Sequence, residues 1–211
     1  MEKNDATHKT RKQQAIETKQ KIFEATMSLA REKGIESVQI EEISKRANVS
    51  MGLFYKYFAN KSDVITESII QSSNAYYNNI IETKLGGLRG KEKIMTFAGY
   101  VAKYHQNELS KEDLRRNYST ILAYSSRGQS ITNELRPIYT LLFDALEEMV
   151  RDMELPSDIS IKDEARHIAM IMRGTVFEYL LSDDSQMFDI YENSMNLIKT
   201  YINGLKYGEK K

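Results

Sequence analysis

The segment that decides the fold of this chain is residues 40–61, which read Ile40-Glu-Glu-Ile-Ser-Lys-Arg-Ala-Asn-Val-Ser-Met-Gly-Leu-Phe-Tyr-Lys-Tyr-Phe-Ala-Asn-Lys61. Ile43 and Ala47 lie four residues apart, and this spacing predicts the inward face of a first short helix. Phe54 and Phe58 have the same spacing and predict the inward face of a second. Two short helices joined by a tight turn form a helix-turn-helix.

The residues between these two helices suit a tight turn. Asn48 falls where the chain reverses, and Asn tolerates the left-handed backbone conformation better than most residues. Val49 is placed to fill the space between the helices. Ser50 is a good N-cap, because its hydroxyl can accept a hydrogen bond from a free amide of the next helix. We therefore expect the second helix to begin directly after Ser50.

The outward face of the second helix carries small, apolar and hydrogen-bonding side chains. A helix presented in this way can enter the major groove of DNA, and Tyr and Lys donors can fix its register on phosphates. The alternative is an ordinary helical hairpin, because paired amphipathic helices are common. The residues that we expect to contact DNA are Lys45, Arg46, Ser50, Met51, Gly52, Leu53, Tyr55, Lys56, Tyr57 and Lys61.

In this region the chain resembles the TetR family of bacterial regulators. Residues 21–34 look like the first helix of that family with its terminating glycine, and residues 49–63 are similar to its recognition helix and the start of its fourth helix. The resemblance implies an all-helical regulator with an N-terminal DNA-binding domain. It also implies a C-terminal domain that dimerises and binds a small molecule.

The resemblance assigns roles to individual positions of the second helix. Base-edge contacts are implied for Met51, Gly52 and Leu53, and phosphate contacts for Tyr55, Tyr57 and Lys61. Three positions depart from the family pattern. Gln39 stands where Thr is usual, which puts the usual hydroxyl cap in doubt, and Asn48 replaces the turn glycine. Leu53 replaces a common Thr, which suggests contact with a thymine methyl group.

Composition agrees with a helical protein of one large or two small domains. The 211 residues include 2 Pro and no Cys, so no disulfide framework and no thiolate metal site is expected. No apolar run approaches the ~20 residues that span a membrane, and the N-terminus has no apolar signal segment. We therefore predict the all-α class, a cytoplasmic location and no membrane partner.

Charge divides unevenly along a chain whose net charge is zero. Residues 1–65 hold 12 Lys and Arg against 9 Asp and Glu, so the positive end coincides with the expected DNA reader. Residues 1–8 are interpreted as a solvated start. Lys9 to Lys12 are either part of that start or an arm that reaches the DNA backbone or minor groove.

Helical patterns continue to the C-terminus. Further helices are expected over about 61–84, 91–107, from 110, around 137, over 160–182 and over 186–206, with the breaker at residues 85–90. Pro137 either kinks its helix or marks the start of it. The predicted domains are residues 1–62, which bind DNA, and residues 63–211, which bind an effector and dimerise, with the fourth helix shared between them.

The last two helices are expected to form a homodimer interface. Both are apolar over a wide arc, which requires cover on more than one side. Two such helices from each chain would make a four-helix interface, and a two-fold dimer would place two readers roughly 34–36 Å apart on a palindromic operator. Packing within the monomer is the alternative for these residues. The interface residues that we predict are Ala169, Met172, Val176, Leu180, Ile190, Ser194, Leu197 and Ile198.

The middle of the chain is rich in tyrosine and is expected to hold the effector. Aromatic and Met side chains can line an apolar pocket in which a few polar groups orient a ligand. Simple core packing is the alternative for each of them. The predicted pocket residues are Tyr100, Tyr104, His105, Tyr118, Leu122, Met170, Arg173 and Phe177.

Enzyme signatures are lacking in the sequence. There is no His-Glu-x-x-His motif, no Gly-rich phosphate loop and no nucleophile elbow, and the Glu164–His167 pair has no second copy that would complete a metal site. We predict no catalytic residue, no metal and no cofactor. The function that we expect is a repressor released from its operator by an unidentified small molecule. The alternatives are an activator of the same family and a helical ligand-binding protein that does not bind DNA.

Overall fold

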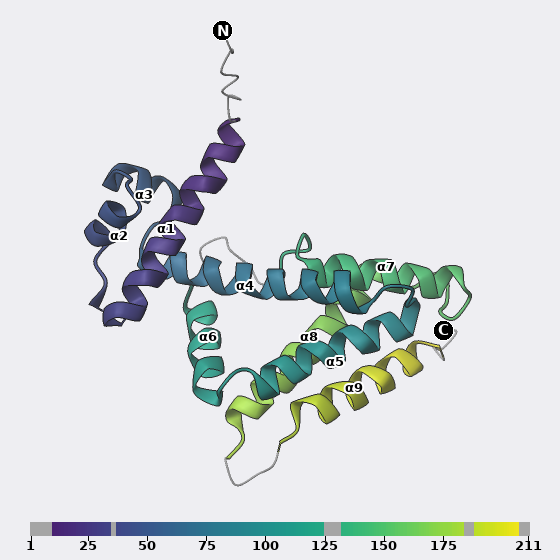
Figure 1. Ribbon diagram of the computed structural model, residues 1–211. Helices are drawn as coiled ribbons and strands as arrows, with labels where there is room; N and C mark the ends of the chain where they lie inside the picture. The colour runs from purple at the N-terminus through teal and green to yellow at the C-terminus, as the bar shows by residue number, and fades with distance from the viewer. Residues whose placement is uncertain (1–9, 35–36, 125–131, 184–187, 207–211) are drawn as a thin grey trace. The chain divides into compact units, whose positions relative to one another are not determined.

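The computed structural model describes residues 10–34, 37–124, 132–183 and 188–206, and within these ranges the regular structure is entirely α-helical (Figure 1). The chain forms two compact units, residues 1–70 and residues 71–211. The division falls inside the fourth helix rather than at 62/63, so this helix contributes residues to both units. Each unit has its own buried core.

The first unit is built from three helices and the start of a fourth: α1 (Arg11–Lys33), α2 (Ile40–Arg46), α3 (Met51–Tyr57) and α4 (Lys61–Lys84). Helix α1 begins well before residue 21, because Thr10 caps it with a side-chain hydrogen bond from the Gln13 amide. Its inward residues meet the predicted inward faces of α2 and α3. The fully buried members of this core include Ile22, Ile43, Phe54 and Val64.

The turn between α2 and α3 has the predicted geometry. Asn48 adopts a positive φ of 54°, and Ser50 accepts a hydrogen bond at its hydroxyl from the Leu53 amide, 3.1 Å away. Gln39, which precedes α2, is not a hydroxyl cap. Instead the Glu42 carboxylate accepts a hydrogen bond from the Gln39 amide at 3.0 Å. This bond satisfies one of the unpaired backbone donors at the start of α2.

The second unit contains the rest of α4 and five further helices: α5 (Gly90–Asn107), α6 (Lys111–Tyr124), α7 (Pro137–Arg151), α8 (Ile161–Leu181) and α9 (Ile190–Leu205). Pro137 marks the start of α7, where a missing amide hydrogen costs nothing. Ser110 and Ser160 cap α6 and α8 as expected. The predicted start of the last helix, Gln186, lies outside the described residues.

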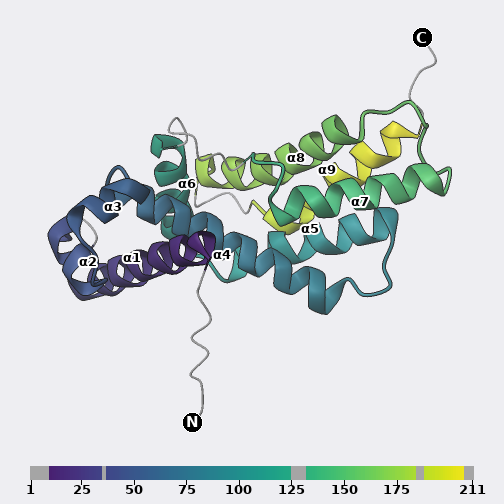
Figure 2. The ribbon, with the colours of Figure 1, turned by 90° about the horizontal axis from the view of Figure 1, so that it is seen from above.

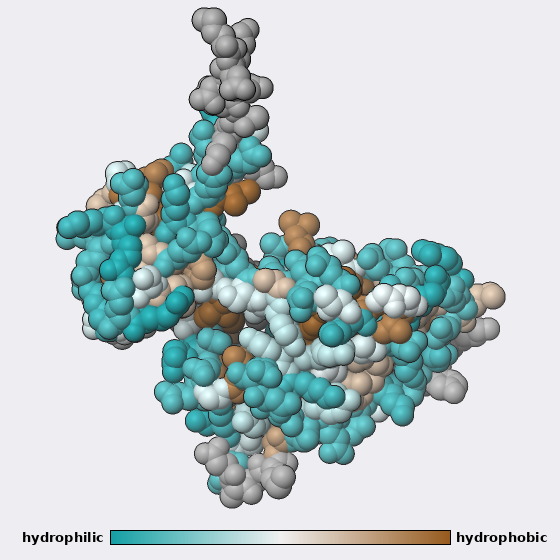
Figure 3. Space-filling view, in the orientation of Figure 1, coloured by the Kyte–Doolittle hydropathy of each residue, from teal (hydrophilic) through white to brown (hydrophobic). Residues whose placement is uncertain are grey.

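Helices α5, α7, α8 and α9 pack together around the main core of the second unit, as two views show (Figures 1 and 2). The core includes Phe97, Tyr139, Leu142 and Ile168, each fully buried. The visible surface is mainly polar, with separate apolar patches (Figure 3). Over the described part of the chain, every helix is too short or too polar to cross a membrane.

Candidate functional site

The helix that we predicted to read DNA is held from one side and open on the other. Phe54 is fully buried and Phe58 nearly so, and both pack into the core of the first unit. The Ser50 cap fixes the N-terminal end of α3. The outward face of α3 is therefore left open within its own unit. Because α3 is short, only a few of its side chains can reach base edges.

Most of the predicted DNA-contact residues lie on this open surface. Tyr55 is 53% exposed and Met51 is 37% exposed. Above Gly52, a Cβ atom would meet open space, with the Ser50 hydroxyl 4.0 Å away as its nearest neighbour. The exposed set is Lys45, Ser50, Met51, Gly52, Tyr55 and Lys56, and the half-buried set is Leu53, Tyr57 and Lys61.

Arg46 has a role that the sequence did not reveal. Its Nη1 donates hydrogen bonds to Glu32 and to the Ser28 hydroxyl of α1. It also borders a hollow of about 440 Å³ beside α1, together with Lys21 and Ala47. The Arg46 guanidinium lowers the pKa of Glu32 chiefly through the hydrogen bond that it donates to that carboxylate. Arg46 thus ties α2 to α1, and we remove it from the residues expected to bind phosphate.

Lys61 also contacts its own unit. Its Nζ donates a hydrogen bond to the Val38 carbonyl at a distance of 3.2 Å, which joins the start of α4 to the segment before α2. A lysine used in this way stabilises the reader and loses part of its freedom to reach a phosphate. Lys45 and Lys56 are exposed cations next to the α2–α3 turn.

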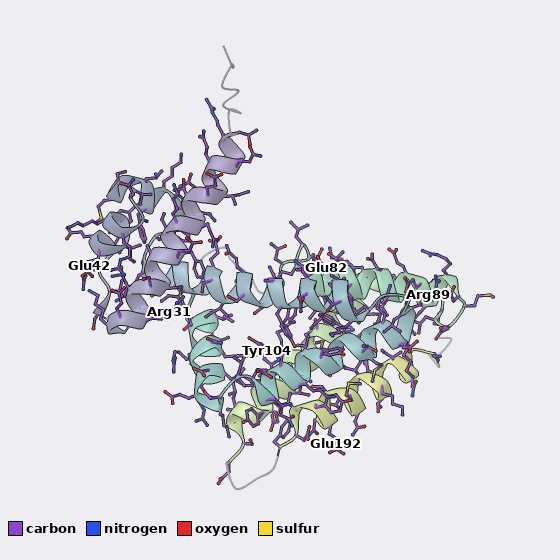
Figure 4. The ribbon with its side chains drawn as sticks, viewed as in Figure 1. Arg31, Glu42, Glu82, Arg89, Tyr104 and Glu192 are labelled. Carbon is purple, nitrogen blue, oxygen red and sulfur yellow. The ribbon has the colours of Figure 1, made fainter. Side chains whose placement is uncertain are left out.

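The predicted pocket residues of the second unit divide into two groups. Tyr104 extends from α5 (Figure 4). Its ring stacks on that of Tyr76 with centroids 4.2 Å apart, and His105, Tyr118 and Arg173 are at least half-buried. The other four are exposed at the surface of their unit. They are Tyr100, Leu122, Met170 and Phe177. Helical periodicity did not separate these groups, because α8 is apolar on two faces.

Two arginines of the second unit contact tyrosines, of which Tyr139 is fully buried and Tyr77 is half-buried. Arg173 of α8 donates a hydrogen bond from Nη1 to the Tyr139 hydroxyl, 3.2 Å away. Arg136, directly before α7, donates from Nε to the Asn74 side-chain carbonyl at 2.9 Å and lies over the Tyr77 ring. The sequence prediction did not name Arg136 and Tyr139, since no motif marks them.

The electrostatics of this group, which we call the arginine–tyrosine cluster (Asn74, Tyr77, Tyr118, Arg136, Tyr139 and Arg173), reflect burial. Burial raises the pKa of the Tyr77 and Tyr118 phenols, and both arginine charges oppose this shift. Burial also lowers the pKa of Arg136, and the positive charge of Arg173 lowers it further. Two guanidiniums therefore act on one another in a desolvated region.

His105 lies one turn beyond Val101 on α5 and beside the Tyr104 ring. Burial lowers the pKa of His105 to about 4, partly opposed by the nearby Val101 carbonyl, so the imidazole is neutral at pH 7. None of the described residues is placed to make a good hydrogen bond to its buried Nδ1.

The predicted dimer residues need correction. Leu197 is 51% exposed, but the other seven are buried within the second unit of the single chain. Ser194, for example, shares a buried hydrogen bond with Thr175 at 2.7 Å. These seven are Ala169, Met172, Val176, Leu180, Ile190, Ser194 and Ile198. They serve the monomer core, so a partner would have to use other side chains.

A different apolar row is exposed on α8. Met170, Phe177 and Leu181 lie at the surface, and Gly174 between them has open space above its Cα. The spacing of four, three and four residues places the row on one helical face. Near one end of this row, His167 Nδ1 lies 2.7 Å from the Tyr201 hydroxyl, which donates a hydrogen bond to Glu164.

The described residues contain no group of three or more His, Cys, Asp or Glu side chains that could hold a metal ion.

Comparison with known proteins gives a family match within the first unit and relatives that align over most of the chain. Residues 22–67 match the family described as bacterial regulatory proteins, tetR family. The HTH-type transcriptional regulator YvdT of Bacillus subtilis is 23% identical over 184 residues, which cover 83% of this chain and 90% of that protein. The fatty acid metabolism regulator protein of the same organism is 20% identical over 189 residues, covering 87% and 93%.

Solved structures share the fold over nearly the whole length. The Thermus thermophilus repressor FadR, in complex with lauroyl-CoA, aligns with a TM-score of 0.59 at 19% identity, covering 89% of this chain and 94% of that chain. The R. erythropolis repressor QsdR aligns with a TM-score of 0.64 at 13% identity, covering 92% and 98%. With its helix-turn-helix and its helical second unit, the chain belongs to the TetR family of bacterial regulatory proteins.

Proposed function

We propose that the protein is a homodimeric repressor whose α3 reads a palindromic operator, and that a small molecule bound in the second unit releases it. The observation that carries the proposal is α3 itself, a helix capped by Ser50 and held by Phe54 with Gly52 and Tyr55 on its open face. A helix fixed on one side and free on the other is what major-groove reading requires.

Relatives support the response to a small molecule. The FadR repressor of similar fold was solved with lauroyl-CoA, and another relative is a fatty acid metabolism regulator. In the proposed mechanism the ligand binds unequally to a DNA-fitting and a DNA-misfitting dimer, and so shifts their populations. A coupling of about 1–3 kcal/mol would change operator affinity about 5–150-fold.

The exposed row on α8 supports a dimer. Met170, Phe177 and Leu181 present an apolar stripe, and Gly174 would let a second helix approach the α8 backbone closely. On α9, Leu197 adds an exposed apolar side chain. A second copy of the chain is the occupant that we propose, because a palindromic operator requires two readers related by a two-fold axis.

The experiment that tests this function is selection of genomic fragments with the purified protein, followed by salt titration on the best fragment. We expect one palindromic site, with affinity falling with salt at a log–log slope of about −0.9 per neutralised phosphate. Reporter expression in cells with and without the protein then separates repressor from activator. A well-folded dimer that enriches no site would contradict the proposal.

Two variants place the reading helix. Gly52→Ala adds a methyl group into open space, so we expect normal folding but weaker operator binding, because the DNA backbone and bases lose room. Tyr55→Phe removes one exposed hydroxyl and should weaken binding to all sequences alike. Tyr191→Phe in the second unit is the matched control for a lost tyrosine hydroxyl.

A further inference from the structure

The arginine–tyrosine cluster has a chemistry that core packing does not require. Its residues come from α4, α6, α7 and α8 and from the segment before α7, so five parts of the chain supply polar groups to one region. Tyr139 is fully buried, and its hydroxyl is the hydrogen-bond partner of Arg173. Apolar side chains would fill a purely structural core at this place with a lower desolvation cost.

The balance of charge in the cluster is positive. Arg173 has a neutral phenol as its hydrogen-bond partner, and among the described residues it forms no ion pair with a carboxylate. Arg166, two turns earlier on the same helix, instead pairs with Glu134 and Asp163. Arg136 is half-buried and close enough to Arg173 for the two charges to repel. Two like charges in a desolvated region cost free energy that an anion between them would recover.

Aromatic rings lie beside the two charges of the cluster. Tyr77 packs edge-to-face against Phe97 with ring centroids 5.5 Å apart, and Tyr139 lies 6.3 Å from Phe143. Guanidinium groups bind carboxylates and phosphates through paired N–H donors, whereas aromatic rings accept an apolar body. The two features together select an amphipathic anion rather than a neutral or cationic compound.

We propose that Arg136 and Arg173 bind the anionic head group, a carboxylate or a phosphate, of the effector, and that its apolar body lies against the surrounding aromatic rings. This inference rests on the proposed function, since it names the ligand class of the proposed effector domain. It also gives that ligand a route to the reader. The anion would bind Arg136, whose guanidinium donates a hydrogen bond to the Asn74 side chain of α4. Helix α4 contributes residues to both units.

A matched pair of fluorescent probes tests the class of ligand without DNA. The anion 8-anilinonaphthalene-1-sulfonate and the neutral N-phenyl-1-naphthylamine share one aromatic body and differ by the sulfonate group. We expect the anionic probe to saturate one site per chain. Its affinity should exceed that of the neutral probe by about tenfold or more, which is the gain that one charge-assisted hydrogen bond provides. Its affinity should also fall as salt rises.

Substitutions locate the probe. Arg173→Gln and Arg136→Gln should each weaken the anion about tenfold and leave the neutral probe unchanged. Arg166→Gln, at an exposed position of α8 where the arginine is paired with Glu134, is the control and should leave both probes unchanged. Circular dichroism melting identifies any variant that fails to fold. A further variant, Arg173→Lys, keeps the positive charge but removes the paired N–H donors of the guanidinium. That variant should bind the anion with intermediate affinity.

Competition separates the two head groups. Dodecanoate and dodecyl phosphate are titrated against the bound anionic probe, with dodecanol as the neutral reference. Displacement by dodecanoate alone assigns a carboxylate, and displacement by dodecyl phosphate alone assigns a phosphate. Displacement by both assigns a general anion site, whereas equal displacement by dodecanol would overturn the proposal.

The outcomes for ligand class and for regulation are independent. Equal affinity for the two probes, no binding of the anionic probe, or anion binding unchanged in both arginine variants would overturn the anionic site even if operator binding is found. Conversely, a selective anion site in a protein that enriches no operator would contradict the proposed repressor and leave the ligand class supported.

Discussion

Arg46, the last residue of α2, is hydrogen-bonded through its guanidinium to Glu32 of α1. Arg46 and Lys56 are both exposed cations near the reading helix, but Arg46 forms an ion pair with Glu32 and Lys56 lies over the Tyr57 ring. The two residues therefore make a matched test of which charges contact DNA.

We predict that Arg46→Gln changes operator affinity by no more than about twofold, while Lys56→Gln weakens binding to all sequences and reduces the salt slope by about one. Fluorescence anisotropy over a range of salt concentrations measures both quantities. A larger loss in Arg46→Gln, with its helical content intact, would return Arg46 to the DNA interface.

Two serines of the first unit should have opposite effects on its stability. Ser44 is 3% exposed, and its Oγ has no hydrogen-bond partner among the described residues, whereas the Ser50 Oγ caps α3. Ser44→Ala should therefore raise the free energy of unfolding by about 1 kcal/mol, because an unpaired hydroxyl is removed. Ser50→Ala should lower it by about 1 kcal/mol. Urea denaturation measures both, and destabilisation by Ser44→Ala would show that its hydroxyl has a partner.

His105 should make the protein sensitive to mild acid. The unfolded chain binds a proton on this imidazole near pH 6.5, but burial lowers the pKa in the folded state to about 4. The contribution of neutral His105 to the free energy of unfolding is therefore fully present above pH 6.5. As the pH falls toward 4, this contribution is lost, which lowers the free energy of unfolding by about 3 kcal/mol in all.

His105→Leu removes this proton linkage, so its unfolding free energy should fall less than that of the wild type between pH 7 and pH 4.5. Thermal or urea unfolding at a series of pH values gives the comparison. The same pH slope in both proteins would mean that His105 is accessible to protons in the folded state.

Adjacent residues of α8 should separate dimerisation from folding. Phe177 is 45% exposed, and Val176 is 1% exposed. Phe177→Glu should give a folded monomer, because it places a charge in the proposed interface, whereas Val176→Glu should unfold the second unit, because it buries an unpaired charge. Analytical ultracentrifugation and circular dichroism distinguish the two results. A Phe177→Glu protein that stays dimeric would exclude this face of α8.

Much of the reading helix was predictable because its signals are local. Asn48 in the turn, Ser50 at the cap and the Phe54–Phe58 pair act within a few residues of one another, and the structure confirms all three. Helix boundaries marked by Ser110, Pro137 and Ser160 were predictable for the same reason.

The faces of α8 and α9 were not predictable in this way. Periodicity showed that α8 is apolar over a wide arc, but it could not say which stripe the monomer buries. Val176 and Phe177 are neighbours with opposite surroundings, and only the packing of α8 against α5, α7 and α9 distinguishes them.

The sequence by itself determined the all-helical class, the helix-turn-helix and the family, because caps, turns and helical spacing depend on residues close together in the chain. Tertiary structure alone decided that Arg46 bonds to Glu32 of α1 and that Lys61 bonds to Val38. It also decided that Arg136 bonds to Asn74 and that Arg173 bonds to the buried Tyr139. These contacts join residues from 14 to 62 positions apart, and no local pattern encodes which distant side chains the folded chain brings into contact.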